Sequence, residues 1–179
     1  MNNKINISYP RTNYLKLNTA IKNLIDRNLT EFLNYGSDTI GYLPYEIDIT
    51  YKRYSYNNYL SFVFYISLYT GGAHPNNTIE TINYNTKENK LVDINTLHSK
   101  NKGILNNLSE LTREILSKNI DYQNNNIMLD MLIEGTKPNT NNFRNFVFTK
   151  DGLLILFEPY QIAPYSSGSK EVIIPYNKL

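Results

Sequence analysis

The chain has 179 residues and a formal net charge of +2, from 18 basic and 16 acidic side chains. A single domain of this length buries roughly 70% of the surface that its unfolded chain would expose, so it needs no disulfide or metal ion to fold. The chain contains no cysteine and two histidines, which excludes a disulfide framework and a thiolate metal site and argues against a multi-histidine metal site. No run of Lys and Arg is present, so we expect no nucleic-acid partner.

The sequence carries no sign of a membrane span or a secretion signal. No stretch approaches the ~18 consecutive apolar residues of a transmembrane helix, and the first residues have neither the basic nor the apolar region of a signal peptide. We therefore expect the chain as given to be soluble. A start so close to a first strand is also typical of a truncated protein, so the presence of a membrane anchor upstream of this sequence stays an open alternative.

The first predicted elements are an edge strand and a helix. Residues 4–10 alternate weakly and end at a proline, which is typical of a short edge strand. Apolar residues then recur at helical spacing, which predicts a helix near residues 18–35 with Asn18 or Thr19 as its N-cap and Gly36 as its stop. The predicted apolar face consists of Ala20, Ile21, Leu24, Ile25, Leu29, Phe32 and Leu33.

From Tyr45 the apolar period changes to two, the period of a strand. Turn residues at 55–59 and a β-branched and aromatic run at 60–70 complete a predicted hairpin over residues 45–70. One face of its first strand carries Ile47, Ile49, Tyr51 and Arg53, and the other carries Glu46, Asp48, Thr50 and Lys52.

The next predicted elements are two short strands and a second helix. Residues 78–84 form a strand, and residues 90–94 return from a polar turn as another. A helix follows near residues 103–118. Its apolar stripe consists of Ile104, Leu105, Leu108, Leu111, Ile115 and Leu116.

The C-terminal part contains the strongest hairpin pattern in the chain. Residues 127–133 fit a helix or a strand, and we favour a helix that ends at Gly135. Residues 143–158 then form a hairpin that turns at Asp151-Gly152, and the last strand covers residues 171–175.

The predicted class is α+β, with a mostly antiparallel sheet or sheets and the two main helices packed on one face. Strands outnumber helices, and the helices interrupt hairpins rather than alternating with single strands. We divide the chain into an N-terminal subdomain, residues 1–77, and a C-terminal subdomain, residues 78–179, that together form one compact unit.

A tight backbone excursion is predicted between two strands at Gly71-Gly72-Ala73-His74-Pro75, and it displays His74 at the rim of the sheet. His74 could act as a general base or contact a ligand. We favour a simple turn capped by His74, because catalysis would need partners that no spacing supplies.

No catalytic constellation is present in the sequence. Glu46 and Asp48 share a strand face and could act as paired carboxylates, but a solvated face neutralised by Lys52 explains them better. No nucleophile elbow, Walker loop, His-Glu-x-x-His helix or calcium loop is found. We therefore predict a non-enzymatic protein without catalytic residues, cofactor or metal. A hydrolase that uses His74 with Glu46 or Asp48 is kept only in reserve.

Sixteen tyrosines invite a carbohydrate-binding interpretation, because rings on a rigid platform stack on sugar faces. Ordinary strand packing explains most of them equally well. The platform would consist of Tyr51, Tyr54, Tyr56, Tyr59, Tyr65 and Tyr69.

Two Pro-Tyr pairs follow the last hairpin, Pro159-Tyr160 and Pro164-Tyr165. Each proline removes a backbone donor and fixes φ, so this segment follows one stiff path and its tyrosines have little entropy left to lose. At least one tyrosine could be exposed as an anchor for a protein partner, or both could pack into the core.

The Gly-Gly-Ala-His excursion, the Asp151-Gly152 hairpin, the Pro-Tyr segment to Gly168 and the terminal residues 172–176 together resemble the paired extracytoplasmic domains of RsiV-type anti-sigma factors. A similar module accompanies the catalytic domain of PdaC-type peptidoglycan deacetylases. The resemblance covers nearly the whole chain. It implies a non-catalytic module outside the membrane, which in RsiV-type proteins is a sensor that binds lysozyme.

The sequence departs from both families. It lacks the sigma-binding segment and transmembrane helix of an anti-sigma factor and the metal-binding catalytic domain of a deacetylase. A net charge of +2 also gives no long-range attraction to basic lysozymes.

From these arguments we expect a cell-envelope binding or sensor module, with lysozyme as the leading partner and a cell-wall glycan as the alternative. The predicted partner-binding residues are Tyr69, Gly71, Gly72, Ala73, His74, Pro75, Pro159, Tyr160, Ile162, Pro164, Tyr165 and Gly168.

Overall fold

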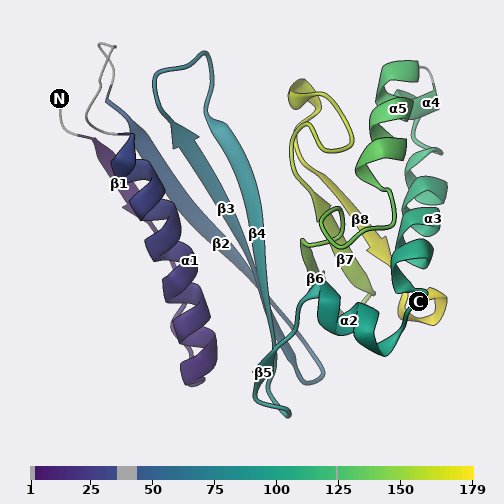
Figure 1. Ribbon diagram of the computed structural model, residues 1–179, viewed down its shortest axis with the longest axis horizontal. Helices are drawn as coiled ribbons and strands as arrows, with labels where there is room; N and C mark the ends of the chain where they lie inside the picture. The colour runs from purple at the N-terminus through teal and green to yellow at the C-terminus, as the bar shows by residue number, and fades with distance from the viewer. Residues whose placement is uncertain (1–2, 36–43, 124) are drawn as a thin grey trace.

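The computed structural model describes residues 3–35, 44–123 and 125–179, which form two β-sheets and the helices around them (Figure 1). The larger sheet has the strand order β1-β2-β3-β4-β5, and the smaller sheet has the order β6-β7-β8. All pairings are antiparallel except that of β1 with β2. The predicted α+β class with mostly antiparallel sheets is confirmed.

The strand bounds are β1 (Lys4–Ile7), β2 (Glu46–Tyr56), β3 (Tyr59–Tyr69), β4 (Asn76–Asn85), β5 (Lys90–Leu91), β6 (Phe146–Phe148), β7 (Leu153–Phe157) and β8 (Lys170–Ile174). The helices are α1 (Leu15–Asn34), α2 (Ile94–Lys100), α3 (Ile104–Leu116), α4 (Ile120–Gln123) and α5 (Asn126–Gly135). Short 3₁₀ turns cover Tyr165–Ser167 and Tyr176–Lys178.

The elements stack in four layers, with α1 at one side, the two sheets in the middle and α3 and α5 at the other side (Figure 1). Buried side chains of α1 pack on one face of the larger sheet, among them Leu24 against Ile47 and Phe62. Alternation along β7 places Leu154 and Leu156 against the larger sheet, while the intervening side chains pack toward α3 and α5. Because there are two sheets, each main helix covers the outer face of its own sheet.

Helix α1 begins four or five residues earlier than the predicted N-caps, Asn18 or Thr19, would place it. Tyr14 is the N-cap residue, so Asn18 and Thr19 lie inside the first turns. The Asn18 side chain instead accepts from the Thr12 backbone N–H at 2.9 Å and donates to the Thr12 carbonyl at 2.8 Å, which fixes the chain that enters the helix. The predicted stop at Gly36 lies outside the described residues.

The predicted apolar faces are largely buried, with one exception in each main helix. Leu33 of α1 is 55% exposed and Ile115 of α3 is 41% exposed, because both lie at the border of the buried stripe near the helix end. Leu17, which was not predicted, is fully buried and occupies the first turn of α1.

The predicted return strand over residues 90–94 is partly wrong. Only Lys90–Leu91 pairs with β4, and a helix that was not predicted, α2, begins at Ile94. The strand ends early because Asp93 starts a helix: its carboxylate accepts from the Thr96 backbone N–H at 2.7 Å and caps α2. The helix favoured over residues 127–133 is confirmed as α5.

The smaller sheet is joined to β4 by side chains that bind backbone groups. The Asn145 amide donates to the Ile79 carbonyl at 2.7 Å, and the Ile79 N–H donates to Glu158 Oε1 at 3.0 Å. The Asn83 amide donates to the Phe146 carbonyl at 2.8 Å. The division into residues 1–77 and 78–179 stays a prediction, and its boundary falls within β4.

No helix among the described residues is long and apolar enough to cross a membrane.

We predict that Gly135→Ala destabilises the fold by at least ~2 kcal/mol, because a Cβ at Gly135 would lie 2.0 Å from the Gln161 carbonyl oxygen. The clash exceeds the helix-propensity gain of about 1 kcal/mol. Urea unfolding measures the effect. Gly72→Ala is the matched control, since its nearest neighbour would be 3.8 Å away. Equal unfolding midpoints for the two variants would contradict the packing described here.

Candidate functional site

The structure brings the Gly-Gly-Ala-His excursion and the Pro-Tyr segment together at one end of the molecule (Figure 1). The His74 ring stacks on the Tyr165 ring, with centroids 3.9 Å apart and planes at 22°. The Tyr165 hydroxyl donates to the Pro75 carbonyl at 2.8 Å and accepts from the Asn77 amide at 3.0 Å. Two motifs 90 residues apart therefore form a single surface.

The backbone of this surface contains three residues with a positive φ, Gly71, Tyr160 and Gly168. Gly71 has φ +90°, which a glycine adopts without strain. Tyr160 has φ +69°, in the left-handed region that tyrosine rarely occupies. The Gln161 N–H donates to the Glu158 carbonyl at 3.1 Å, so Pro159 and Tyr160 are the central residues of a turn whose second central position normally holds glycine.

Contacts on both sides of this turn hold Tyr160 in its strained conformation. The Gln161 amide donates to the Asn142 carbonyl at 2.9 Å and to the Gly135 carbonyl at 3.2 Å. Glu158 accepts a hydrogen bond from the Ile79 N–H of β4 and forms an ion pair with Arg144. The Tyr160 side chain itself is 61% exposed, and its ring centroid lies 5.4 Å from that of Tyr165.

The predicted partner-binding residues differ in their exposure to solvent. Ile162 is fully buried, so its prediction as a contact residue is wrong, and its role is to anchor the segment in the core. Gly71, Gly72, Ala73, His74, Tyr160 and Gly168 are exposed, whereas Tyr69, Pro75, Pro159, Pro164 and Tyr165 are partly buried. Partner binding by these other residues stays a prediction.

Beside the His74–Tyr165 stack lies a cleft of about 490 Å³, which we call the rim cleft. Its floor comes from the larger sheet and its wall from the Pro-Tyr segment. The lining consists of Asp48, Thr50, Tyr65, Ile66, Ser67, Asn77, Thr78, Ile79, Pro159, Tyr165, Ser166, Gly168 and Ser169. The cleft thus combines hydroxyl and amide groups with tyrosine rings.

Tyr65 is the aromatic residue that the larger sheet contributes to this cleft. Burial raises the pKa of Tyr65, and the negative charge of Glu171 raises this pKa further. Its hydroxyl is enclosed and has no hydrogen-bond partner within the part of the chain that the structure describes. Lys52 Nζ lies 5.3 Å from the Tyr65 ring centroid. Lys52 thus makes a cation–π contact with Tyr65, and its neutralisation of the carboxylates of β2 stays a prediction.

The other predicted catalytic groups have structural partners. Lys4 lies 3.6 Å from Glu46, and Asp48 accepts from the Asn6 amide. His74 Nδ1 lies 2.9 Å from the Pro75 carbonyl oxygen, which can only accept, so Nδ1 is the donor in this contact. Among the described residues, no group of three or more His, Asp or Glu side chains could hold a metal ion.

The predicted tyrosine platform does not form. Tyr51 lies on the α1 side of the larger sheet beside Phe62 and Phe64, with centroids 6.1 and 6.2 Å away. Tyr56 stacks on Tyr176 at 5.1 Å, and Tyr59 stacks on Phe148 at 3.7 Å. Of the predicted platform only Tyr65 lines the rim cleft, together with Tyr165 from the Pro-Tyr segment, and Tyr160 lies beside Tyr165.

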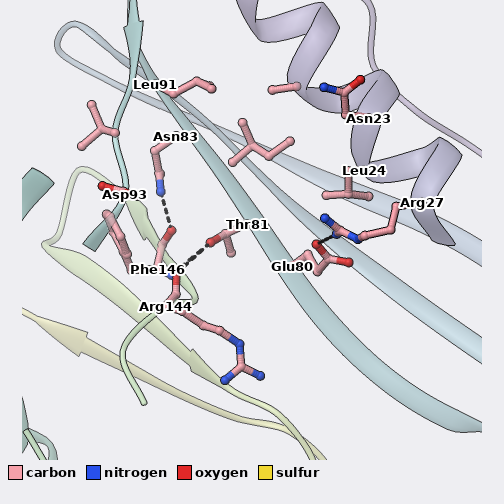
Figure 2. Close-up of a pocket in the computed structure, with 13 residues that line it drawn as sticks. Asn23, Leu24, Arg27, Glu80, Thr81, Asn83, Leu91, Asp93, Arg144 and Phe146 are labelled. Carbon is pink, nitrogen blue, oxygen red and sulfur yellow. Dashed lines mark hydrogen bonds and ion pairs between the residues drawn. The ribbon is translucent and has the colours of Figure 1, made fainter. Parts of the chain in front are cut away.

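A second cleft, which sequence reasoning missed, lies between α1, β4 and β6 (Figure 2). We call it the edge groove. It has two adjoining parts of about 370 and 520 Å³ that share Arg27, Glu80, Thr81 and Arg144. No local motif marks it, because its lining is dispersed over three elements and each residue looks like an ordinary surface residue in the sequence.

Two family descriptions match the chain. Residues 2–77 match the family described as Deacetylase PdaC, and residues 95–177 match the family described as Protein of unknown function (DUF3298). The predicted resemblance to the PdaC-type module is confirmed. The resemblance to RsiV-type anti-sigma factors is not shown by these matches and stays a prediction.

Related proteins and solved structures extend these matches. Peptidoglycan-N-acetylmuramic acid deacetylase PdaC of Bacillus subtilis is 26% identical over 172 residues, which are 94% of this chain and 36% of the deacetylase. Immunogenic protein MPT64 of Mycobacterium tuberculosis is 26% identical over 179 residues, 96% of this chain and 74% of MPT64. The chain therefore spans about a third of the deacetylase, 36% of its length.

Two crystal structures of DUF3298 family proteins have the same fold. The protein from Pseudomonas aeruginosa PAO1 has a TM-score of 0.64 and 18% identity, covering 84% of this chain and 65% of that chain. The protein from Bacteroides fragilis has a TM-score of 0.58 and 21% identity, covering 89% and 63%. At these identities the likeness concerns the fold alone.

We predict that Tyr160→Gly is more stable than Tyr160→Ala by about 1 kcal/mol, because alanine keeps the steric cost of a positive φ and glycine does not. Thermal and urea unfolding of the two variants measure the difference. A less stable glycine variant would mean that Tyr160 is not strained in solution.

Proposed function

We propose that the chain is a non-catalytic binding module of the bacterial cell envelope, located outside the cytoplasm, and that it holds a segment of cell-wall glycan in the rim cleft. The observation that carries this proposal is the union of the His74–Tyr165 stack with a cleft lined by hydroxyl and amide side chains. The similarity to a peptidoglycan deacetylase supports the same ligand.

A glycan fits the chemistry of the rim cleft. Sugar hydroxyls both donate and accept, which matches the side chains of Thr50, Ser67 and Asn77. The apolar C–H face of a sugar ring packs on an aromatic side chain. Tyr165 supplies such a ring in the cleft lining, and the exposed ring of Tyr160 lies next to it, with centroids 5.4 Å apart. The cleft walls belong to both halves of the chain, which explains why neither motif forms the site alone.

The conformation of Tyr160 is a second argument for binding. A non-glycine residue in the left-handed region costs of order 1–3 kcal/mol, and such residues cluster at functional sites. Tyr160 is also 61% exposed, so its ring contributes little to the core in return. A strained and exposed tyrosine is explained by a ligand that contacts its ring.

A protein partner such as lysozyme is the second candidate, and the exposure of Tyr160 favours it specifically. Tyrosine is among the residues that dominate protein interfaces, and Tyr160 lies directly beside Tyr165. The net charge of +2 provides no long-range attraction to a basic partner. Because the lining of the rim cleft is polar, we favour a glycan over a protein partner as its ligand.

We predict that the chain is retained on purified peptidoglycan and that Tyr160→Gly weakens this binding by about 3- to 10-fold, the effect of losing one aromatic contact of ~0.5–1.5 kcal/mol. Co-sedimentation with insoluble peptidoglycan and calorimetric titration with lysozyme measure the two candidates in parallel. Tyr9→Ala is the control, because Tyr9 is 60% exposed but lines a different cleft, beside α1, whereas the Tyr160 ring lies next to Tyr165 of the rim cleft.

Two results would count against the glycan. All protein remaining in the supernatant at high micromolar concentration would exclude it. The other result has two parts: lysozyme releases or absorbs heat with the wild-type chain but not with Tyr160→Gly, and the chain is not retained on peptidoglycan. This result would assign the same surface to a protein partner.

A further inference from the structure

The edge groove lies along the outer edge of β4, and α1 and β6 approach it from opposite sides (Figure 2). Arg27 enters from α1, and Arg144 enters from the segment that leads into β6. Asn23 lies one helical turn before Arg27 on the same wall. The groove is thus open and is lined by long polar side chains.

An added peptide strand would meet backbone groups of β4 that already have partners at Ile79 and Asn83. The Ile79 N–H binds Glu158, and the Ile79 carbonyl accepts from Asn145. The Asn83 carbonyl accepts from the Val92 N–H at 2.8 Å. Two side chains and the chain after β5 therefore occupy backbone positions that a pairing strand would need, which disfavours strand addition as the binding mode.

The charges of the groove exclude an anionic ligand. Four acidic side chains line it against two arginines, and the acidic ones are Glu31, Glu80, Asp93 and Glu158. Most of these charges are already compensated, since Arg27 pairs with Glu80, Arg144 pairs with Glu158 and Asp93 caps α2. A carboxylate or phosphate would compete with these acids for the arginines. A neutral polar ligand meets no such opposition.

Donors and acceptors remain free within this network. Arg27 binds Glu80 through Nη2, which leaves N–H groups on Nε and Nη1. The Asn83 amide donates to Phe146, while its Oδ1 is buried and has no donor within the described residues. Leu91 is 45% exposed and adds an apolar surface to the same wall. Hydrogen-bond donors and an acceptor next to an apolar surface match a saccharide, whose hydroxyl groups both accept and donate and whose ring has apolar C–H faces.

We propose that the edge groove is a second saccharide site. The inference rests on the proposed function, because it assigns a further segment of the same class of ligand to the same module. Thr78 and Ile79 line both clefts, and the Glu158-Pro159 segment lies between them. A glycan chain that reaches both sites binds the second one intramolecularly, so affinity rises with chain length.

The test is a two-dimensional NMR titration with soluble N-acetylglucosamine oligomers, a trimer and a longer chain, followed by affinity measurements. We expect the trimer to shift the backbone amides of Thr81 and Leu91, which line the groove and stay unchanged in the variant, separately from those of the rim cleft. The variant with Asn23→Ala and Arg27→Gln should lose the groove shifts, keep the rim shifts and bind the longer chain at least ~5-fold more weakly. Both positions are exposed on α1, so the fold is expected to persist.

Thr30→Ala is the control, because Thr30 is exposed on α1 and lines neither cleft. Shifts at the rim alone, with no dependence of affinity on chain length, would overturn the edge-groove proposal and leave the proposed function in place. Shifts at the groove alone would support the groove and overturn the rim cleft. An oligomer that shifts neither set overturns both.

Discussion

Both clefts depend on the two hydrogen bonds that the backbone N–H and the backbone carbonyl of Ile79 make. Its N–H is bound by Glu158 and its carbonyl by Asn145, so two side chains from the C-terminal half occupy the edge of a strand from the N-terminal half. A buried side chain with a hydrogen bond to backbone fixes register as well as distance. The Pro-Tyr segment begins at Glu158, and this bond therefore sets where Tyr165 meets His74.

The hydrogen bond between Glu158 and the Ile79 N–H also helps to keep Tyr160 in its strained conformation. The turn is held before its first central residue by Glu158 and after its second by Gln161 and the buried Ile162. Gly135 allows the close approach of this segment to the end of α5, where a larger residue would clash with the Gln161 carbonyl. A rigid frame thus holds an exposed ring in a conformation that tyrosine alone would avoid.

Periodicity predicted most of the fold, and local chemistry explains the errors. Helical spacing located α1 and α3, and strand spacing located both hairpins. Asn18 was misassigned because a residue suited to capping also bonds well from inside the first turn, here to Thr12. The sequence also marked both motifs of the rim cleft. It did not show the positive φ of Tyr160, since no glycine signals it, or the edge groove, whose residues meet only through tertiary packing.

The central claim is that tyrosine rings of the rim cleft contact a cell-wall glycan. Saturation-transfer difference NMR tests it most directly, with irradiation of the aromatic protons of the protein in the presence of a soluble N-acetylglucosamine oligomer. The account predicts the strongest transfer to the C–H protons on one face of a sugar ring, the protons that pack on an aromatic side chain. No transfer to any sugar proton, under conditions where the protein is folded, would contradict it.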